Sequence, residues 1–491
     1  MSRAEITGRE NEQAILKDAL ESSHSEFIAI YGRRRVGKSF LVTQFFSKKN
    51  CIFFYTTGVK DGTYKKQREQ FTKIIADVFY NGAELKPKNS WLEIFESLTS
   101  SLKNIPSNKK IVLFFDEFPW MVTKRAGLLE AVDYYWNRYW THDDRIKLII
   151  CGSSAAWIVN NIINNKGGLH NRITYQINLE VFNLSETKSY LNKSGIKLND
   201  SQIMQIYMVT GGVPFYLSNI KSGSSAIQII EKLAFRKNSL LQGEFDNLFS
   251  SLFENQDIYI KAIKLIAKQR YGVNQEILLR ALGKSMLGMG GLKILDDLER
   301  AGFIISFKPH FHKKKGVYYK VIDEYISFYL DWVEPIKNTL LTRSLEQGYW
   351  EKQQSSAAWH SWAGYAFEAL CYKHLSQIRK ALSLNASAIP NTWRYTPKIG
   401  TKEKGAQIDL LFDRDDDCIT ICEIKYTDKP FEIDKQYAAN LLNKIEVFKK
   451  VTRTKKQIFL AIISVNGLKP TMYSAKLVST VVTLSDLFAK F

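Results

Sequence analysis

The first 180 residues alternate short apolar runs with stretches of helical period. The apolar runs occupy residues 27–32, 52–55, 111–115 and 147–151, and each is nearly continuous. Continuous apolar strands that are separated by helices are typical of a parallel sheet covered on both faces. We therefore expect an α/β domain over residues 1–182, built on a parallel sheet.

The pattern changes three times after this domain, so the chain is expected to be an α/β multidomain protein. Residues 183–252 predict a helical lid, interrupted by Gly211-Gly212-Val213-Pro214. Residues 253–335 predict three helices and then two strands, the order of a winged helix. A helical connector over 336–360 leads to a C-terminal α/β domain over 361–491, with a helix near 362–378, strands near 408–412, 419–426 and 458–464, and a crossing helix near 434–450.

Composition narrows the environment and the partners. A chain of 491 residues is too long for a single hydrophobic core, so several domains are expected. A net charge of +20 favours binding to a polyanion, with DNA more strongly indicated than an acidic membrane surface. A basic but merely solvated surface is the alternative. The five cysteines are scattered, which argues against a disulfide framework. We expect a cytoplasmic protein, since the chain shows neither a signal peptide nor a membrane-spanning run.

A phosphate-binding loop follows the first apolar run. The run ends at a segment that fits GxxxxGK[ST] and is followed by an apolar helix, which is the context that this motif requires. Backbone N–H groups of such a loop wrap phosphates, Lys38 is expected to reach the β- and γ-phosphates, and Ser39 to hold Mg²⁺. The predicted ATP-binding segment is Gly32-Arg33-Arg34-Arg35-Val36-Gly37-Lys38-Ser39.

A second motif supports the loop. The apolar run 111–115 ends in Asp116 and Glu117, which fits a Walker B strand. Asp116 is expected to bind Mg²⁺, and Glu117 to polarise the attacking water. Ser153, after the next strand, is either a γ-phosphate sensor or part of a simple turn. Arg172 is either an arginine finger that acts on a neighbouring subunit or a surface ion pair.

These motifs carry a resemblance. Gly8-Arg9-Glu10, the loop at 32–39, Asp116-Glu117-Phe118 and Gly211-Gly212-Val213-Pro214 resemble the prokaryotic or archaeal-type ATPases of the AAA+/STAND class. The resemblance covers roughly residues 5–335. It implies ATP hydrolysis, with a winged helix after the ATPase, and the triple arginine in the loop is a habit of that family.

The C-terminal domain contains a second candidate site. If 408–412 and 419–426 form a hairpin centred on Asp416, then Asp409 stands opposite Glu423. Lys425 shares a face with Glu423, because side chains two residues apart in a strand point to the same side. Two facing carboxylates attract a divalent cation, and Lys425 is then placed to orient water or to stabilise charge on a phosphate.

This D…ExK pattern resembles the PD-(D/E)XK nucleases. The resemblance implies that Glu368, on the preceding helix, adds a further acid to the Mg²⁺ ligands Asp409 and Glu423. The proline that often precedes the first Asp is missing, as is a Gln-x-x-x-Tyr element. The alternative is an ordinary hairpin whose Glu–Lys pair solvates one face.

Two basic runs add to the picture, at 310–315 in the expected wing and at 449–456 after the penultimate helix. Either run is a phosphate-backbone contact or a solvated loop. The leading hypothesis is an ATP-dependent, DNA-associated protein with Mg²⁺-dependent endonuclease activity that is gated by nucleotide. The alternative is a STAND-like switch that forms an ATP-dependent homo-oligomer and uses its C-terminal domain to bind DNA or protein without cleavage.

Overall fold

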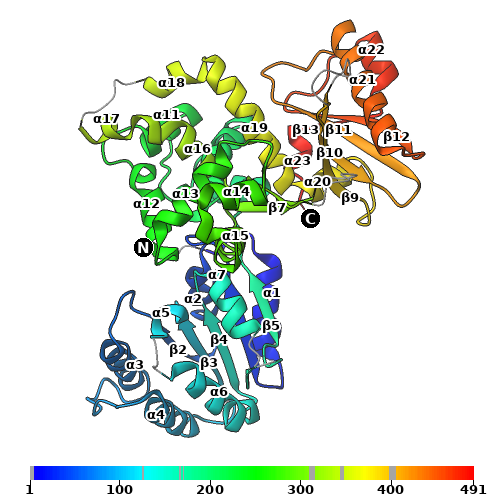
Figure 1. The fold of residues 1–491 in the computed structure, drawn as a ribbon. Helices are drawn as coiled ribbons and strands as arrows, with labels where there is room; N and C mark the ends of the chain where they lie inside the picture. The colour runs from blue at the N-terminus through cyan, green and yellow to red at the C-terminus, as the bar shows by residue number, and fades with distance from the viewer. Residues whose placement is uncertain are drawn as a thin grey trace. The chain divides into compact units, whose positions relative to one another are not determined.

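The structure is a computed structural model that describes residues 5–123, 127–164, 167–169, 171–308, 316–342, 348–397 and 405–490 (Figure 1). The chain divides into two compact units. The first ends at Val181 and takes in Arg300–Gly302, and the second contains Phe182–Glu299 and Phe303–Phe491. The division lies next to the boundary predicted after residue 182, and the boundaries predicted within the second unit stay predictions.

The first unit is a parallel sheet with helices on both faces, as the apolar runs predict. The strand order is β2-β3-β4-β1-β5, and every pairing is parallel. The last strand was not anticipated, since its four residues alternate in burial and lack a continuous apolar run. The strands are β1 (Glu26–Tyr31), β2 (Cys51–Thr57), β3 (Lys110–Asp116), β4 (Ile146–Cys151) and β5 (Tyr175–Asn178).

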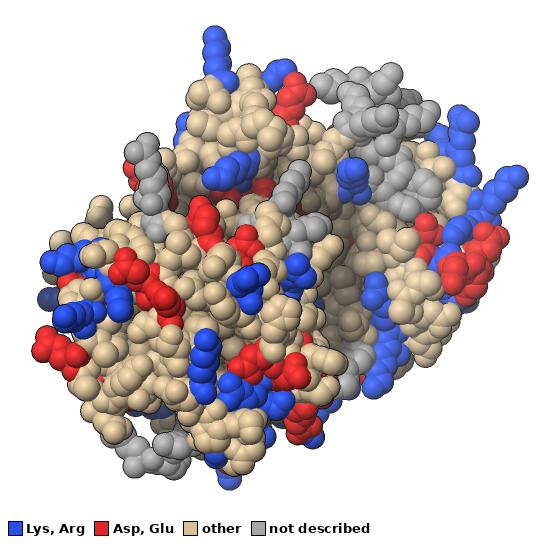
Figure 2. Space-filling view, turned by 90° about the horizontal axis from the view of Figure 1, so that it is seen from below, with Lys and Arg blue, Asp and Glu red and all other residues tan. Residues whose placement is uncertain are grey.

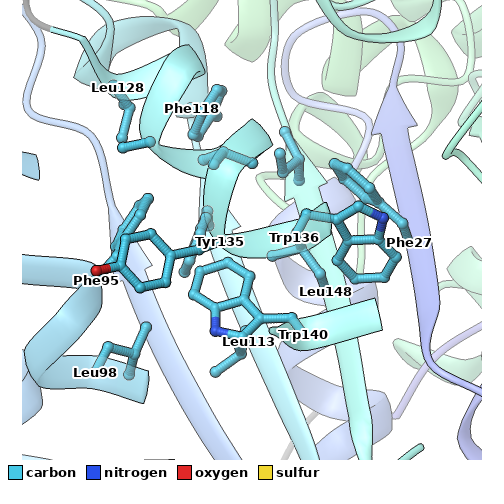
Figure 3. Packing of buried hydrophobic residues seen from close by; sticks show 14 of the residues in the cluster. Phe27, Phe95, Leu98, Leu113, Phe118, Leu128, Tyr135, Trp136, Trp140 and Leu148 are labelled. Carbon is cyan, nitrogen blue, oxygen red and sulfur yellow. The ribbon is translucent and has the colours of Figure 1, made fainter. Parts of the chain in front are cut away.

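Two apolar clusters fill the space between this sheet and its helices. The larger cluster joins the sheet to α3, α4 and α6, and the smaller one joins it to α1 and α2. Figure 3 shows the larger cluster, in which the rings of Phe27 and Trp136 lie 4.9 Å apart. The helices are α1 (Glu10–Glu21), α2 (Lys38–Phe46), α3 (Tyr64–Phe79), α4 (Trp91–Lys103), α5 (Phe118–Met121), α6 (Leu128–Arg138) and α7 (Ala155–Ile158), with short turns at Trp140–His142 and Val159–Ile163.

The second unit begins with five helices. The first of them begins after Asn183, which is its N-cap and forms a capping box with Glu186. Gly212 has a φ of 69°, and a Cβ there would lie 2.1 Å from the Phe182 carbonyl oxygen, so this turn requires glycine. The helices are α8 (Leu184–Lys193), α9 (Asp200–Thr210), α10 (Pro214–Leu217), α11 (Ala226–Ala234) and α12 (Leu240–Leu252).

The segment from 256 to 321 contains the expected three helices and strand pair, and we call it the α13–β8 module. A two-residue strand, β6, joins the pair to give an antiparallel sheet of order β6-β8-β7. The assignment as a winged helix stays a prediction, and the basic run at 310–315 lies outside the described residues. The elements are α13 (Gln256–Ala267), β6 (Val273–Asn274), α14 (Gln275–Leu282), a turn at Lys284–Met286, α15 (Met289–Arg300), β7 (Ile304–Phe307) and β8 (Tyr318–Val321).

The connector is helical and rich in buried aromatic rings, including those of Tyr329, Trp332 and Trp350. Among the described residues, every helix falls short of the length and apolar character that crossing a membrane needs. The connector elements are α16 (Glu324–Phe328), turns at Tyr329–Val333 and Glu334–Ile336, α17 (Lys337–Thr342) and α18 (Tyr349–Gln354).

The C-terminal module, residues 357–490, is a mixed sheet of order β13-β12-β11-β10-β9. The hairpin of β10 and β11 and the helix that crosses from β11 to a parallel β12 are confirmed. The helix expected near 362–378 is two helices that break at His374, and the edge strands β9 and β13 were not anticipated. The elements are α19 (Ala357–Lys373), α20 (Leu375–Ala381), β9 (Ile389–Tyr395), β10 (Ala406–Asp413), β11 (Cys418–Lys425), α21 (Lys435–Thr452), β12 (Gln457–Ser464), α22 (Met472–Leu477), β13 (Thr480–Thr483) and α23 (Leu484–Leu487).

Candidate functional site

The phosphate-binding loop lies between β1 and α2, as its motif predicts. Gly32 has a φ of 133°, and a Cβ there would lie 2.3 Å from the carbonyl oxygen of Leu179. Gly37, at the N-cap of α2, is left-handed with a φ of 92°. Both positions therefore need glycine, one because a neighbouring backbone passes close by and one because of its dihedral angles. The helix N-terminus that follows supplies backbone N–H groups to an anion.

Lys38 is the first residue of α2, and its side chain is buried. Its ammonium donates to the carbonyl oxygens of Gly32 at 2.9 Å and Arg33 at 2.8 Å. Burial lowers the pKa of Lys38, and Cys151, Glu117 and Asp116 oppose that shift. Lys38 is thus folded back onto its own loop, within the electrostatic reach of the two acidic residues that end β3. Ser39, the second residue of α2, is half-buried.

Asp116 and Glu117 end β3, which lies two strands away from the loop strand β1. Asp116 is buried, and its Oδ1 accepts the Glu117 N–H at 3.0 Å. Glu117 itself is left-handed, with a φ of 43°. This left-handed residue turns the chain out of the sheet directly after Asp116, so Glu117 does not continue the strand.

Ser153 contacts Glu117 across the ends of β3 and β4. The Ser153 N–H and hydroxyl both donate to Glu117 Oε2, at 3.0 and 2.8 Å. Ser153 therefore does more than turn the chain after β4, because it fixes the orientation of the carboxylate that was predicted to polarise water.

Arg172 lies at the opposite edge of the sheet from the loop. It is exposed and precedes β5, whose first residue, Tyr175, pairs with Ile28 near the start of the parallel strand β1. The loop follows the other end of β1, after Tyr31. Arg172 is consequently remote from the phosphate loop of its own chain, so a finger role is open to it only toward a second copy.

The second predicted site forms one pocket in the second unit. In the β10–β11 hairpin, Leu410 pairs with Cys422, and Asp409 and Glu423 are the next residues along the two strands, in agreement with the hairpin spacing. A pocket of about 390 Å³ is lined by side chains from α19, β10, β11, α21 and the loop before β6. All four predicted residues line it: Glu368, Asp409, Glu423 and Lys425.

Glu423 is the most heavily contacted of the four. Its carboxylate accepts from Tyr437 at 2.5 Å and forms ion pairs with Lys425 at 2.9 Å and Lys444 at 2.7 Å. Burial opposes ionisation of this group, but the two ammonium groups hold the pKa of Glu423 below its ordinary value. Glu423 is therefore charged and committed to three partners.

Glu368 and Asp409 behave differently from Glu423. Burial, and after it the charge of Asp409, raises the pKa of Glu368 to about 8. Burial, and then the charge of Glu423, also raises the pKa of Asp409. A hard divalent cation would relieve this repulsion, and Mg²⁺ commonly uses one or two carboxylates and fills its remaining positions with water and phosphate. The donor chemistry of this pair fits Mg²⁺, although nowhere in the described ranges do three or more His, Cys, Asp or Glu side chains form a cluster that could hold a metal.

Sequence reasoning missed two residues on α21 that contact Glu423. Tyr437 and Lys444 are seven residues apart, both donate to the Glu423 carboxylate, and Lys444 also lines the pocket. A spacing of seven places two side chains on one face of a helix, so the signal was present in the sequence. Tyr271, which lines the same pocket from the α13–β8 module, carries no comparable signal, because a contact over so long a separation depends on the fold.

The remaining basic run, at 449–456, is only partly available to a polyanion. Lys456 forms an ion pair with Asp413 at 2.8 Å and also donates to the Arg414 carbonyl. Lys449 is exposed. Figure 2 shows basic and acidic side chains interspersed over the face in view rather than gathered in a single basic field.

Comparison with known proteins bears on the first of the two sites. Residues 6–220 match a family described as an ATPase domain predominantly from Archaea. This stretch is an archaeal-type ATPase domain. The P-loop geometry and the acidic end of β3 lie within it, and the activity that it brings to the chain is that of an ATPase, which binds nucleotide and usually Mg²⁺.

Similarity to single proteins extends further along the chain. The uncharacterized protein MJECL04 of Methanocaldococcus jannaschii is 25% identical over 438 residues, which covers 87% of this chain and 89% of that protein. The Walker-type ATPase PABY2304 of Pyrococcus abyssi aligns with a TM-score of 0.47 at 18% identity, over 66% of this chain and 96% of that one. The Aeropyrum pernix ORC2 protein aligns with a TM-score of 0.41 at 14% identity, over 72% and 96%.

Proposed function

We propose that this ATPase controls a Mg²⁺-dependent DNA endonuclease site in its C-terminal module. The observation that carries the proposal is the convergence of Glu368, Asp409, Glu423 and Lys425 on one pocket. These residues come from a helix and from both strands of a hairpin, and they combine two carboxylates suited to a cation with a positively charged side chain. The net charge of +20 favours a polyanionic substrate such as DNA.

Each residue of the pocket has a role in this proposal. Glu368 and Asp409 would hold Mg²⁺, which when bound would lower the pKa of water and draw charge from a phosphate oxygen. Lys425, fixed by its ion pair with Glu423, would stabilise charge that develops on the phosphate. Lys444 completes the site as a positioning residue, because it holds the second oxygen of Glu423.

The ATP site has its own assignments. Lys38 would leave the carbonyl oxygens of its loop to bind the β- and γ-phosphates, Ser39 and Asp116 would hold Mg²⁺, and Glu117 would polarise water. Ser153 would report the presence of the γ-phosphate through Glu117, which it already contacts. Arg172 would act on the nucleotide of a neighbouring copy in an ATP-dependent homo-oligomer.

Nicking of supercoiled plasmid tests the nuclease part. The full chain is compared with Asp409→Asn and Lys425→Met in the presence of Mg²⁺, and Asp413→Asn is the matched control, because Asp413 lies on the same strand but pairs with Lys456. We expect nicking to fall at least 100-fold in the first two variants and to stay normal in the control. Equal nicking in all four proteins would exclude this pocket as the active site.

The same assay with and without ATP tests the gating. Lys38→Met removes the phosphate-binding lysine but leaves the C-terminal pocket untouched. If nucleotide gates the site, the ATP dependence of nicking disappears in this variant. If nicking by Lys38→Met still responds to ATP as it does in the unaltered protein, the ATP site does not gate the nuclease site.

A non-cleaving switch is the second candidate, and the two ion pairs of Glu423 favour it. Glu423 is already neutralised by Lys425 and Lys444, which is an arrangement that also suits a pocket that binds without cutting. In that case ATP would change assembly and not cleavage. Both candidates allow assembly on ATP, so native mass with and without ATP is read together with the plasmid assay. A switch would assemble on ATP while neither the unaltered chain nor any variant nicks DNA.

A further inference from the structure

The mouth of the C-terminal pocket is bordered by a residue from the α13–β8 module. Tyr271 lies in the loop between α13 and β6 and lines the pocket together with Glu368 and Asp409. Its hydroxyl lies 2.7 Å from that of Tyr365 on α19, within hydrogen-bonding distance. The guanidinium of Arg394, on β9, lies over the Tyr271 ring at 5.2 Å. One tyrosine of the module thus touches two elements of the C-terminal module at the entrance of the pocket.

Arg270, the neighbour of Tyr271, strengthens this junction from the other side. Its guanidinium lies 4.5 Å from the centre of the Tyr365 ring. It also pairs with Asp331 of the connector at 3.6 Å and reaches the Ser361 hydroxyl at 3.5 Å. Arg270 and Tyr271 therefore hold Tyr365 through its ring face and through its hydroxyl.

Lys320 brings a positive charge from β8 to Glu368, together with which it lines a second, smaller cavity. Its ammonium lies 3.5 Å from the centre of the Tyr372 ring, and Tyr372 donates a hydrogen bond to the Asp409 carbonyl. Burial lowers the pKa of Lys320 to about 8, and the carboxylates of Glu368 and Asp409 oppose that shift. The module therefore supplies a cation within the electrostatic reach of the two acids that suit Mg²⁺.

A cavity lies between the two modules behind this junction. It measures about 80 Å³ and is lined on one side by Arg270 and Lys320 and on the other by Tyr365 and Glu368. Buried Glu324 also lines it. A cavity of this size has room for water, and charged and apolar side chains both contribute to its wall. A mixed contact of this kind resembles interfaces that separate more than it resembles a permanent core.

The individual contacts are weak, because each is a cation–π contact, a neutral hydrogen bond or a partly exposed ion pair. A ligand that binds the open arrangement better than the closed one can therefore shift the balance toward the open arrangement.

We infer that Arg270, Tyr271 and Lys320 form a clasp that holds the α13–β8 module against the C-terminal pocket and restricts the access of a DNA phosphate to it. Tyr271 narrows the entrance, and Lys320 competes with a divalent cation for Glu368 and Asp409. The consequence for cleavage rests on the proposed function, whereas the clasp itself does not.

Hydrogen exchange of the full chain tests the clasp without any reference to activity. In Tyr271→Ala, amides of α19 around Tyr365 and Glu368 should exchange at least fivefold faster than in the unaltered protein, with α2 unchanged. Tyr271→Phe, which keeps the ring and loses the hydroxyl, should lie between them. Tyr318→Phe, on β8 of the same module, is the control. Unchanged exchange of α19 in Tyr271→Ala would overturn the clasp, whatever the protein does to DNA.

Binding of Mn²⁺, measured by electron paramagnetic resonance without nucleotide, tests the competition. Lys320→Met should bind Mn²⁺ at least tenfold more tightly than the unaltered chain, while Lys320→Arg and the surface control Lys293→Met should not. Equal affinity in Lys320→Met would overturn the competition. Asp409→Ala is the control that removes the proposed metal ligand. If this variant binds Mn²⁺ as tightly as the unaltered chain, the metal site of the proposed function is excluded. The hydrogen-exchange experiment still tests the clasp in that case.

Discussion

Lys38 and Lys425 each bring a positive charge to a candidate phosphate site, but the two sites are built differently. Lys38 donates to carbonyl oxygens of its own loop, and burial lowers its pKa. Lys425 is partly buried and paired with Glu423, which raises the pKa of Lys425 although burial opposes it. One site is a contiguous backbone cradle, and the other is an ionic network of side chains from separate elements. Substitutions should accordingly affect chemistry alone in the first, and chemistry together with stability in the second.

The largest expected effect tests the cradle. Lys38→Met should lower ATP hydrolysis roughly 10³-fold, the usual range for losing an electrostatic contact to the reacting phosphates. The free energy of unfolding should change by less than about 1 kcal/mol, because the variant also removes the cost of burying a charge. Steady-state ATPase assays and urea unfolding measure the two quantities. Lys48→Met, just after α2, is the control, and a large loss of stability in Lys38→Met would contradict the distinction between the sites.

The next effect is a loss of stability at low pH, and it should appear only in the second unit, where His374 lies. His374, between α19 and α20, is buried, accepts the Leu184 N–H at 3.0 Å on Nε2 and contacts the Leu370 carbonyl at 2.8 Å through Nδ1. Nδ1 therefore carries the proton, and a second proton on Nε2 would face the Leu184 N–H. Burial lowers the pKa of His374 to about 4 from its ordinary 6.5, Lys373 adds to the shift and the Leu370 contact opposes it.

The sign of this pH dependence follows from linkage. Between pH 6.5 and 4 the unfolded chain binds a proton that the folded chain refuses, so stability falls as the pH falls. The loss approaches about 3 kcal/mol below pH 4. Urea unfolding between pH 4 and 7.5 measures it, and His374→Asn should flatten the dependence relative to the exposed control His360→Asn on α19. An equal slope in both variants would assign the effect to other groups.

A smaller effect tests the ionic network. Lys444→Met leaves Glu423 with Lys425 and Tyr437 only, and should cost about 2 kcal/mol, since a charged hydrogen bond to a buried carboxylate is lost. Lys449→Met, exposed on the same helix, should cost little. Combining Lys444→Met with Glu423→Gln should restore much of the loss, because the uncompensated charge is then gone. Purely additive losses in this double-mutant cycle would contradict the network.

The candidate residues of the ATP site were easier to locate from the sequence than those of the C-terminal site, because the first set is contiguous in the chain and the second is not. Gly32, Gly37 and Lys38 sit in one short segment whose spacing is imposed by local backbone geometry, so the motif alone locates them. Asp409 and Glu423 were also predictable, because a hairpin register is local once its turn is located. Tyr437 and Lys444 were overlooked although their helical spacing was visible.

Other features lay beyond any local pattern. Tyr271 lines the pocket, and Lys320 lies beside Glu368 in the adjoining cavity, only because two modules pack together. His374 follows the end of α19, where one helix was predicted near 362–378, and its contact with Leu184 spans 190 residues. The edge strands β5, β9 and β13 were missed, because burial on one face alone leaves no continuous apolar run. Family similarity supports the ATPase part, and the nuclease and winged-helix assignments still depend on the experiments above.

The smallest expected effect concerns Ser153, a side-chain contact within the otherwise backbone-built ATP site. Ser153→Ala keeps the backbone N–H bond to Glu117 and loses the hydroxyl bond at 2.8 Å. Losing one hydrogen bond of about 1 kcal/mol should lower kcat for ATP about fivefold, with little change in KM, since the carboxylate is less well oriented toward water. Ser153→Thr should retain activity, and Ser154→Ala should be neutral. If kcat rises in Ser153→Ala, the serine restrains Glu117 rather than aligning it, and the hydroxyl is then a brake that nucleotide binding must release.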